Sequence, residues 1–145
     1  MPAKDKRLYF HLQRTAHLVQ KQADQRLIAA ANVTVAQAAI LMVLDEHGGC
    51  SQKTLANHLG QNDSAITAMV TRLVRLGHIH KVRDDRDGRA VRLRLTSSGK
   101  AALAAARGPF DHINATIDAC LSADETSDLA DCLRRLARAF GGPDA

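Results

Sequence analysis

Aromatic residues are scarce in this sequence, whose 145 positions hold one tyrosine, three phenylalanines and no tryptophan. Proteins that bind single-stranded nucleic acid usually stack successive bases on several exposed rings. The scarcity therefore argues against a single-strand binder of that kind. It argues more weakly against a small-molecule pocket built from stacked rings.

Cysteine is also rare, and Cys50, Cys120 and Cys132 lie far apart in the sequence. Three scattered cysteines do not form a disulfide framework. Cys50 stands beside a predicted helix N-terminus, which can lower the pKa of a thiol, so it is the best candidate for a thiol switch. Cys120 and Cys132 fall in predicted apolar helices, where we expect packing or interface residues.

Long apolar runs and catalytic arrangements are absent as well. No stretch approaches the roughly 18 apolar residues of a membrane span, and the N-terminus lacks the apolar run of a secretory signal. We therefore expect a cytoplasmic protein with no membrane contact. No nucleophile with an adjacent base, no phosphate loop and no carboxylate pair can be recognised, so the sequence predicts neither an enzyme nor a cofactor.

Two histidines, His78 and His80, have a spacing that could place both imidazoles on one face of a strand. Such a pair could contribute to a zinc site, but no third ligand is close in sequence. Ordinary strand histidines are the favoured interpretation, and no metal site is predicted.

Positive charge is concentrated in one part of the chain. The whole sequence has 20 basic and 15 acidic residues, a formal excess of +5. Residues 72–94 hold eight basic and three acidic residues, which is also an excess of +5 (8 − 3), so the rest of the chain is balanced. Concentrated positive charge of this kind is typical of a nucleic-acid-binding surface.

The stretch that begins at Asn62 predicts a helix with two different faces. Apolar residues recur every three or four positions and form one buried stripe. The opposite face carries small or hydroxyl-bearing residues at its N-terminal end and arginines further along, which suits close approach to a phosphate-lined groove. The buried stripe is Ile66, Met69, Val70, Leu73 and Leu76, and the opposite face is Ser64, Ala68, Thr71, Arg72 and Arg75.

A two-stranded hairpin is predicted directly after this helix. Residues 79–83 and 90–96 alternate in the manner of strands, and Asp87-Gly88 is a turn signature because glycine tolerates positive φ. In the second strand, Val91, Leu93 and Leu95 should share one face and Arg92 and Arg94 the other. The two arginines could equally be solvated.

Three helices are expected before this helix and hairpin. A long helix is predicted over residues 5–32, with apolar residues beyond one stripe that call for a second partner or, alternatively, a wide core face within a monomer. Thr34 and Gln37 form a capping box for a helix that should be buried nearly all round and should end at Gly48-Gly49. Ser51 should cap a short helix that ends at Gly60, and Asp63 or Ser64 should cap the helix that follows.

The C-terminal part predicts two further helices. Thr96, Ser97 or Ser98 should cap the first, and Gly108-Pro109 should kink or break it. Ser122 and Glu125 form a second capping box that opens the last helix. The residues expected to face inward in the last helix are Leu129, Leu133, Leu136, Ala137 and Phe140.

Taken together, the run from Ser64 to Gly77, Arg83, the Asp87-x-Arg89 pair and the closure Val91-x-Leu93-x-Leu95-Thr96-x-x-Gly99 resemble the core of MarR/SlyA-type transcriptional regulators. This resemblance implies a mainly α fold with a small antiparallel β wing. It implies a winged helix-turn-helix core at 34–97 and helical dimerisation regions at 1–33 and 98–145, all in one continuous domain. The physics of a two-fold axis agrees, since two paired recognition helices can enter successive major grooves.

By the same resemblance, the expected function is that of a homodimeric regulator that binds a pseudo-palindromic operator in double-stranded DNA. We expect a repressor that a small-molecule effector releases, with the effector and its site unknown. Family effectors, often anionic or phenolic, bind between the dimerisation helices and the winged region. A protein-interaction module, or a redox-sensing or metal-sensing module, on the same scaffold remains the alternative.

The resemblance assigns DNA contacts residue by residue. Phosphate contacts are expected from the start of the short helix and from the later arginines, although Arg72 could instead pair with an acid in its own subunit. Ala68 departs from the family, which often has Arg or Lys there, so a guanine contact is in doubt and a thymine methyl contact is possible. At the wing tip, arginines are candidates for minor-groove insertion and Asp87 for holding Arg89 in place, unless the tip is merely a charged turn. The full set is Ser51, Gln52, Lys53, Ser64, Ala65, Thr67, Ala68, Thr71, Arg72, Arg75, Arg86, Asp87 and Arg89.

Overall fold

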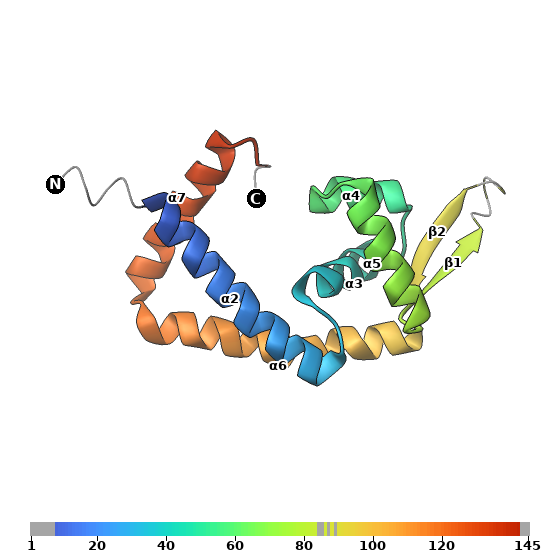
Figure 1. Cartoon of the computed structure of the whole chain (residues 1–145), viewed down its shortest axis with the longest axis horizontal. Coiled ribbons are helices and arrows are strands. Elements are labelled where there is room, and N and C mark those ends of the chain that lie inside the picture. The colour runs from blue at the N-terminus through green and yellow to red at the C-terminus, as the bar shows by residue number, and fades with distance from the viewer. Residues whose placement is uncertain (1–7, 84–85, 87, 89, 143–145) are drawn as a thin grey trace. The chain divides into compact units, whose positions relative to one another are not determined.

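The structure is a computed structural model that describes residues 8–83, 86, 88 and 90–142. Within these residues the chain forms six helices and one two-stranded antiparallel sheet (Figure 1), which confirms the mainly α fold class with a small β wing. The chain divides after Pro109 into two compact units. The elements are α2 (Leu8–Ala31), α3 (Val35–His47), α4 (Gln52–Leu59), α5 (Asp63–Arg75), β1 (Ile79–Arg83), β2 (Val91–Leu95), α6 (Ser97–Cys120) and α7 (Ala123–Ala139).

The first described helix, α2, is long but buries little. Its predicted start at Asp5 lies outside the described residues. Only Ala23 and Leu27 are buried. Near its end, the Asp24 carboxylate accepts a 2.8 Å hydrogen bond from the backbone N–H of Val35, which joins α2 to the first turn of α3. The exposed large apolar residues of α2 are Leu8, Tyr9, Phe10, Leu12, Leu18, Val19 and Ile28.

Helix α3 begins and ends as the sequence predicts. Thr34 and Gln37 form the expected capping box, and Gly48 ends the helix with a φ of +61°, where a side chain would be strained. The expectation of burial all round is wrong, because Met42 is 44% exposed. The helix therefore faces the core on one side rather than lying inside it.

The core lies among α3, α4, α5 and the sheet. Helix α4 contacts both α3 and α5, and α3 also contacts β2. Ser51 caps α4 and Gly60 ends it, as predicted. The large core side chains that are fully buried in these elements are Ile40, Leu41, Leu44, Leu55, Ile66, Val70, Leu73, Ile79 and Leu93.

The predicted hairpin is present, with β1 and β2 paired so that Ile79 lies opposite Leu95 and Arg83 opposite Val91. Leu93 is buried and Val91 is exposed, so the apolar face is covered only toward the base of the wing. A third backbone segment joins the sheet through Cys50. Its N–H donates to the Leu93 carbonyl at 3.1 Å, and the Leu93 N–H donates back at 2.8 Å.

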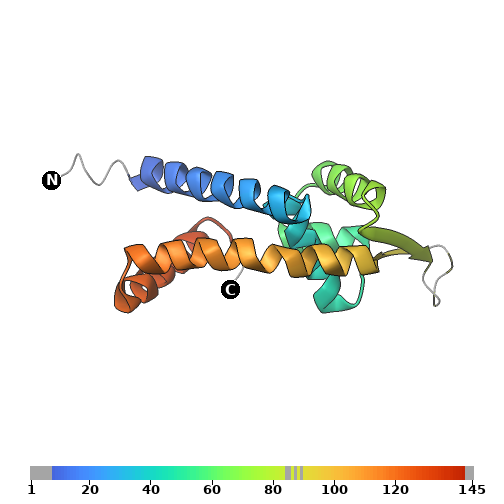
Figure 2. The same cartoon turned by 90° about the horizontal axis from the view of Figure 1, so that it is seen from below.

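Helix α6 is continuous from Ser97 to Cys120, with Pro109 inside it (Figure 2). The predicted break at Gly108-Pro109 is therefore wrong, and the alternative of a kink there stays a prediction. Proline disfavours a helical residue before it largely through a clash with that residue's Cβ, and Gly108 has no Cβ. The remaining costs are one missing backbone hydrogen bond and the crowding of the proline ring against the carbonyl of Ala105, in a long alanine-rich helix.

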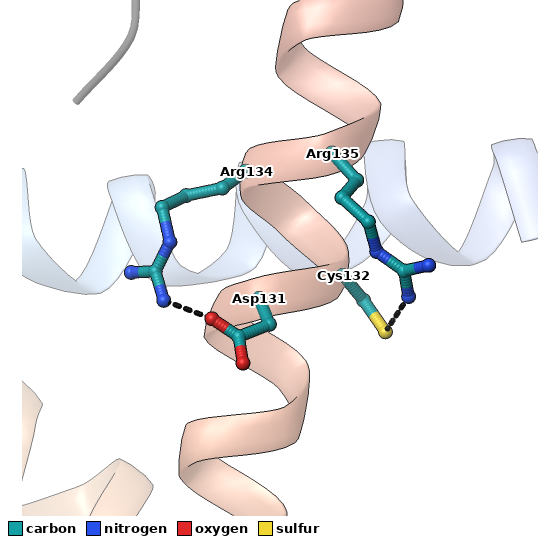
Figure 3. Close-up of polar contacts among 4 residues, drawn as sticks. All are labelled: Asp131, Cys132, Arg134 and Arg135. Carbon is teal, nitrogen blue, oxygen red and sulfur yellow. Dashed lines mark hydrogen bonds and ion pairs between the residues drawn. The ribbon is translucent and has the colours of Figure 1, made fainter.

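Helix α7 opens with the predicted capping box of Ser122 and Glu125. None of its described residues is buried, so the expected inward face is not covered within this chain. Leu129 and Leu133 are 45% and 43% exposed, and the neighbouring Phe140 is 89% exposed. Along its surface Arg134 pairs with Asp131, and Arg135 donates to the Cys132 sulfur (Figure 3).

No single helix of the described chain has the length and apolar character needed to cross a membrane. Helices α2 and α3 pass the same test only when taken together, and they are bent by 65° at the break between them.

Candidate nucleic-acid interface

The helix α5 presents the two faces that the sequence predicts. Ile66, Val70 and Leu73 are buried in the core. Its first turn is capped by Asn62, whose side chain accepts a 2.8 Å hydrogen bond from the Ala65 N–H, so the prediction of Asp63 or Ser64 as the cap is wrong. The predicted DNA-facing residues other than Ala65, which is half-buried, are exposed: Ser64, Thr67, Ala68, Thr71, Arg72 and Arg75.

Each hydroxyl group on this exposed face donates its proton within the protein. Ser64 Oγ donates to Asn62 Oδ1 at 2.9 Å. Thr67 Oγ1 donates to the Asp63 carbonyl at 2.8 Å, and Thr71 Oγ1 to the Thr67 carbonyl at 2.8 Å. The face is therefore defined by methyl groups and oxygen lone pairs rather than by free hydroxyl protons.

A side-chain hydrogen bond connects α4 to α5 at this surface. Gln52, the first residue of α4, donates from Nε2 to Thr67 Oγ1 at 2.7 Å. Since Thr67 already donates to a carbonyl, it must accept from the amide, which fixes the orientation of the Gln52 side chain. Lys53 beside it is exposed, and Ser51 uses its hydroxyl oxygen to cap α4 through the Thr54 N–H at 3.1 Å.

Exposed cations extend from α5 onto the wing. Arg72 and Arg75 are exposed, as are Lys81, Arg83 and Arg94. Within the described part of the chain Arg72 forms no ion pair, so the alternative of an acid partner in its own subunit finds no such partner among those residues. None of these five cations forms an ion pair with another described residue, which makes the surface attractive to a polyanion.

The tip of the wing is only partly described. Arg86 is exposed. Asp87 and Arg89, the predicted clamp and the predicted minor-groove residue, lie outside the described residues. Their assignment rests on the sequence alone.

Arg92 has a structural role that the sequence did not reveal. Its guanidinium donates to the carbonyl of Gly49 at 2.7 Å and is half-buried, so the alternative that both strand arginines are solvated is wrong for Arg92. Its neighbour Arg94 is exposed and lies over Gly49, where an added Cβ would come within 2.7 Å of Arg94 Cγ. Arg92 and Gly49 are 43 positions apart, so no local sequence pattern connects them. The Gly48-Gly49 pair just before Cys50 was a partial signal that another segment lies close to the backbone there.

The closure motif after β2 anchors the wing to the end of α5. The Thr96 N–H donates to the His78 carbonyl at 3.1 Å, and Thr96 Oγ1 accepts from the Gly99 N–H at 3.0 Å, which makes Thr96 the cap of α6. Gly99 lies so close to this turn that a Cβ would be 2.1 Å from the His78 carbonyl oxygen. The Thr-x-x-Gly spacing thus holds the base of the wing against the end of α5.

Cys50 does not have the environment of a reactive thiol. It is only 6% exposed, and burial raises the pKa of its thiol, an effect that the charge of Arg92 partly offsets. The adjacent helix N-terminus therefore does not lower the pKa of Cys50, and the reason for choosing it as the best thiol-switch candidate is wrong. Cys120 and Cys132 are both exposed, so neither packs inside this chain.

The histidines do not assemble a metal site in the described residues, which hold no group of three or more ligands. His78 precedes β1 and contacts Ser98 Oγ through Nδ1 at 2.9 Å, so it does not share a strand face with His80. An unpredicted pair, His47 and His58, lies with ring centroids 4.6 Å apart and ring planes tilted by 54°, at the ends of α3 and α4.

Comparison with known proteins gives consistent matches. The sequence profile of the MarR family matches residues 31–90. The HTH-type transcriptional regulator TtmR of Methylorubrum extorquens is 32% identical over 96 residues, and the transcriptional activatory protein BadR of Rhodopseudomonas palustris is 32% identical over 97 residues. These alignments cover 66% and 65% of this chain but 49% and 55% of the relatives, so the chain spans about half the length of the curated relatives it matches.

A solved structure matches nearly the whole chain. The PcaV transcriptional regulator from Streptomyces coelicolor, crystallised in complex with its natural ligand, is 32% identical, with a TM-score of 0.75. The match covers 92% of this chain and 91% of that one.

Proposed function

The chain belongs to the MarR family of winged helix-turn-helix, DNA-binding transcriptional regulators, and from that premise we propose that it acts in the cytoplasm as a homodimeric repressor released by a small-molecule effector. The family is one of regulators and not of enzymes. The proposal extends to a pseudo-palindromic operator, read by one winged region of each subunit.

One observation carries the DNA contact: α5 buries one stripe of apolar residues and exposes the opposite face. A side chain at Ala68 or Thr71 has no role in the core, and small residues there let the helix backbone come close to base edges. In the proposal Ser64, Ala65, Thr67, Ala68 and Thr71 face the major groove. The exposure of this face supports the assignment.

Cations around that face supply the contacts to phosphate in the proposal. Arg72 and Arg75 lie about one turn and nearly two turns beyond Ala68 on the same helix. Lys53 stands in the first turn of α4, and the proposed contacts there include Ser51 and Gln52. Arg86, Arg89 and the supporting Asp87 are proposed for the minor groove, on the basis of the sequence motif.

The terminal helices, residues 1–33 and 98–145, are proposed to form the dimer. Support comes from the described apolar surface that this chain leaves open on α2 and α7, including Phe10 at 66% and Leu129 at 45% exposed. Two winged regions related by a two-fold axis would then reach half-sites about one helical turn apart.

The repressor direction and the effector are the finer parts of the proposal. BadR is named an activatory protein, so relatives with either direction of control are possible. PcaV was crystallised with a natural ligand, which supports a small molecule as the releasing signal. A ligand changes DNA affinity only if it prefers one arrangement of the two recognition helices over another.

Fluorescence anisotropy with DNA from upstream of the chain's own gene tests the DNA-binding proposal. At physiological salt we expect binding about 10³-fold or more tighter than to a shuffled duplex of the same composition. Equal affinity for both duplexes would contradict the proposal. A reporter driven by the same DNA separates the directions of control, since loss of the protein should raise expression from a repressed promoter and lower it from an activated one.

The effector proposal has its own test. A library of small anionic and phenolic compounds is added to the preformed complex, and release is followed by the same anisotropy signal. At least one compound should lower DNA affinity by about 5- to 150-fold, the usual range of allosteric coupling. Release by mild oxidants alone would instead favour a redox sensor.

A further inference from the structure

The hydroxyl groups on the exposed face of α5 have a shared feature that the family assignment does not supply. Ser64, Thr67 and Thr71 each donate their only hydroxyl proton to an acceptor inside the protein. Ala65 and Ala68 between them have no polar side-chain atom. From residue 64 to residue 71 the side chains assigned to the major groove therefore offer no free hydrogen-bond donor.

What remains on these side chains is apolar or accepting. The two threonines and two alanines each carry a methyl group. The hydroxyl oxygens keep lone pairs, although Thr67 Oγ1 spends one on Gln52 Nε2 at 2.7 Å. This combination differs from the arginine or lysine that would grip guanine through two donated hydrogen bonds.

The chemistry of base edges then selects among base pairs. Guanine shows only acceptors, O6 and N7, in the major groove, so against the side chains of residues 64–71, which offer no free donor, it would lose water without compensation. The amino groups of adenine and cytosine can donate to a hydroxyl oxygen, so lone pairs do not tell these bases apart. Thymine alone adds a methyl group, which packs well against methyl groups of the protein.

We propose that the segment from Ser64 to Thr71 reads thymine methyl groups, so that the half-site positions facing it are A·T pairs. This inference rests on the proposed function and narrows its substrate to duplexes with thymine at those positions. Arg72 and Arg75 lie beyond the segment and leave the rest of the half-site open to other bases.

Thr71 gives the sharpest test because it is exposed and its hydroxyl contacts only its own helix. Thr71→Val keeps the methyl and removes the hydroxyl, whereas Thr71→Ser keeps the hydroxyl and removes the methyl. The probe is a duplex selected by the wild-type protein from randomised DNA, compared with a copy in which deoxyuridine replaces thymine in the half-sites. Uracil pairs as thymine does but lacks the methyl group.

The expected pattern is a coupling between one protein methyl and the DNA methyls. Deoxyuridine should weaken wild-type binding by about fourfold per contacted methyl. Thr71→Ser should weaken binding to the thymine duplex by about fourfold and change binding to the deoxyuridine duplex little. Thr71→Val should stay within about twofold of wild type on each duplex, and deoxyuridine in the flanks serves as the DNA control.

Two results would overturn the inference while leaving sequence-specific binding intact. One is equal affinity for the thymine and deoxyuridine duplexes. The other is a large loss with Thr71→Val and none with Thr71→Ser, which would show that the hydroxyl contacts DNA. Failure of the selected duplex to bind better than a shuffled one would instead overturn the proposed function, and this inference with it.

Discussion

The winged region and the terminal helices differ in how completely this chain covers their apolar residues. Leu41, Leu55 and Leu73 in the winged region are 0% exposed. The described residues of α7 include none that is buried, and α2 buries only Ala23 and Leu27. The winged region buries its apolar side chains within this chain. The terminal helices leave apolar surface exposed, and we propose that a second copy of the chain covers it.

The largest effect expected from this difference concerns two leucines. Leu73→Ala in α5 should lower the free energy of unfolding by about 2–5 kcal/mol, because it leaves a cavity in a fully buried site. Leu133→Ala in α7, which is 43% exposed, should cost far less in a dilute monomer. Urea denaturation at several protein concentrations measures both.

Protein concentration sharpens that comparison. If α7 is covered by a second copy, the penalty of Leu133→Ala should grow as concentration rises and dimers form. The penalty of Leu73→Ala should be nearly independent of concentration. Equal, concentration-independent penalties at the two sites would break the contrast between the regions.

A second, smaller effect is expected where the wing joins α6. Gly99→Ala places a Cβ 2.1 Å from the His78 carbonyl oxygen, so the backbone must shift, at a cost of about 1–3 kcal/mol. Lys100→Ala, at the exposed neighbouring position, should stay within about 0.5 kcal/mol of wild type. Thermal denaturation of the two variants measures the difference. A Gly99→Ala protein as stable as wild type would mean that the wing is not held at this turn.

On the exposed face of α5 the expected change lies in DNA binding rather than in stability. Arg72→Ala should reduce the slope of log K against log salt by about 0.9, the value for one lost phosphate contact. Arg107→Ala, an exposed arginine on α6, serves as the control and should leave the slope unchanged. Anisotropy titrations across a salt series measure both, and identical slopes for the two variants would remove Arg72 from the interface.

The smallest expected effect concerns the buried Cys50 and appears as a dependence of stability on pH. Burial raises the pKa of Cys50 above its ordinary value, so the unfolded chain releases this proton at lower pH than the folded chain. The contribution of Cys50 to stability is then intact below about pH 8.5 and is lost as the pH rises toward the folded pKa. Denaturation under reducing conditions at about pH 7.5 and about pH 9.5 should show a steeper decline for wild type than for Cys50→Ala. Parallel declines would contradict the raised pKa.

Local sequence patterns predicted those parts of the fold that depend on neighbouring residues. The capping boxes at Thr34 and Ser122 and the αL glycines at 48 and 60 form as expected, since each needs only a few adjacent residues. The two faces of α5 follow from its apolar period alone. The sequence was therefore enough to separate the two faces of this helix, although Ala65 on the predicted exposed face and Met69 in the predicted buried stripe are both half-buried.

Contacts between distant residues could not be predicted in this way. The bond from Arg92 to Gly49 and the bridge of Cys50 with Leu93 join segments about 43 residues apart, and no spacing rule connects them. The burial of Cys50 that follows from this bridge outweighed the helix N-terminus beside it. The helix through Pro109 was missed because the prediction rested on the missing amide proton of the proline and its clash with the preceding turn.

Sedimentation of the protein with its selected duplex tests most directly whether two recognition helices share one operator. We predict a complex of two chains per duplex. Scrambling either half-site should weaken the binding of the protein to the duplex. A single chain bound with full affinity to one half-site, or sedimentation no different from that with shuffled DNA, would contradict the account.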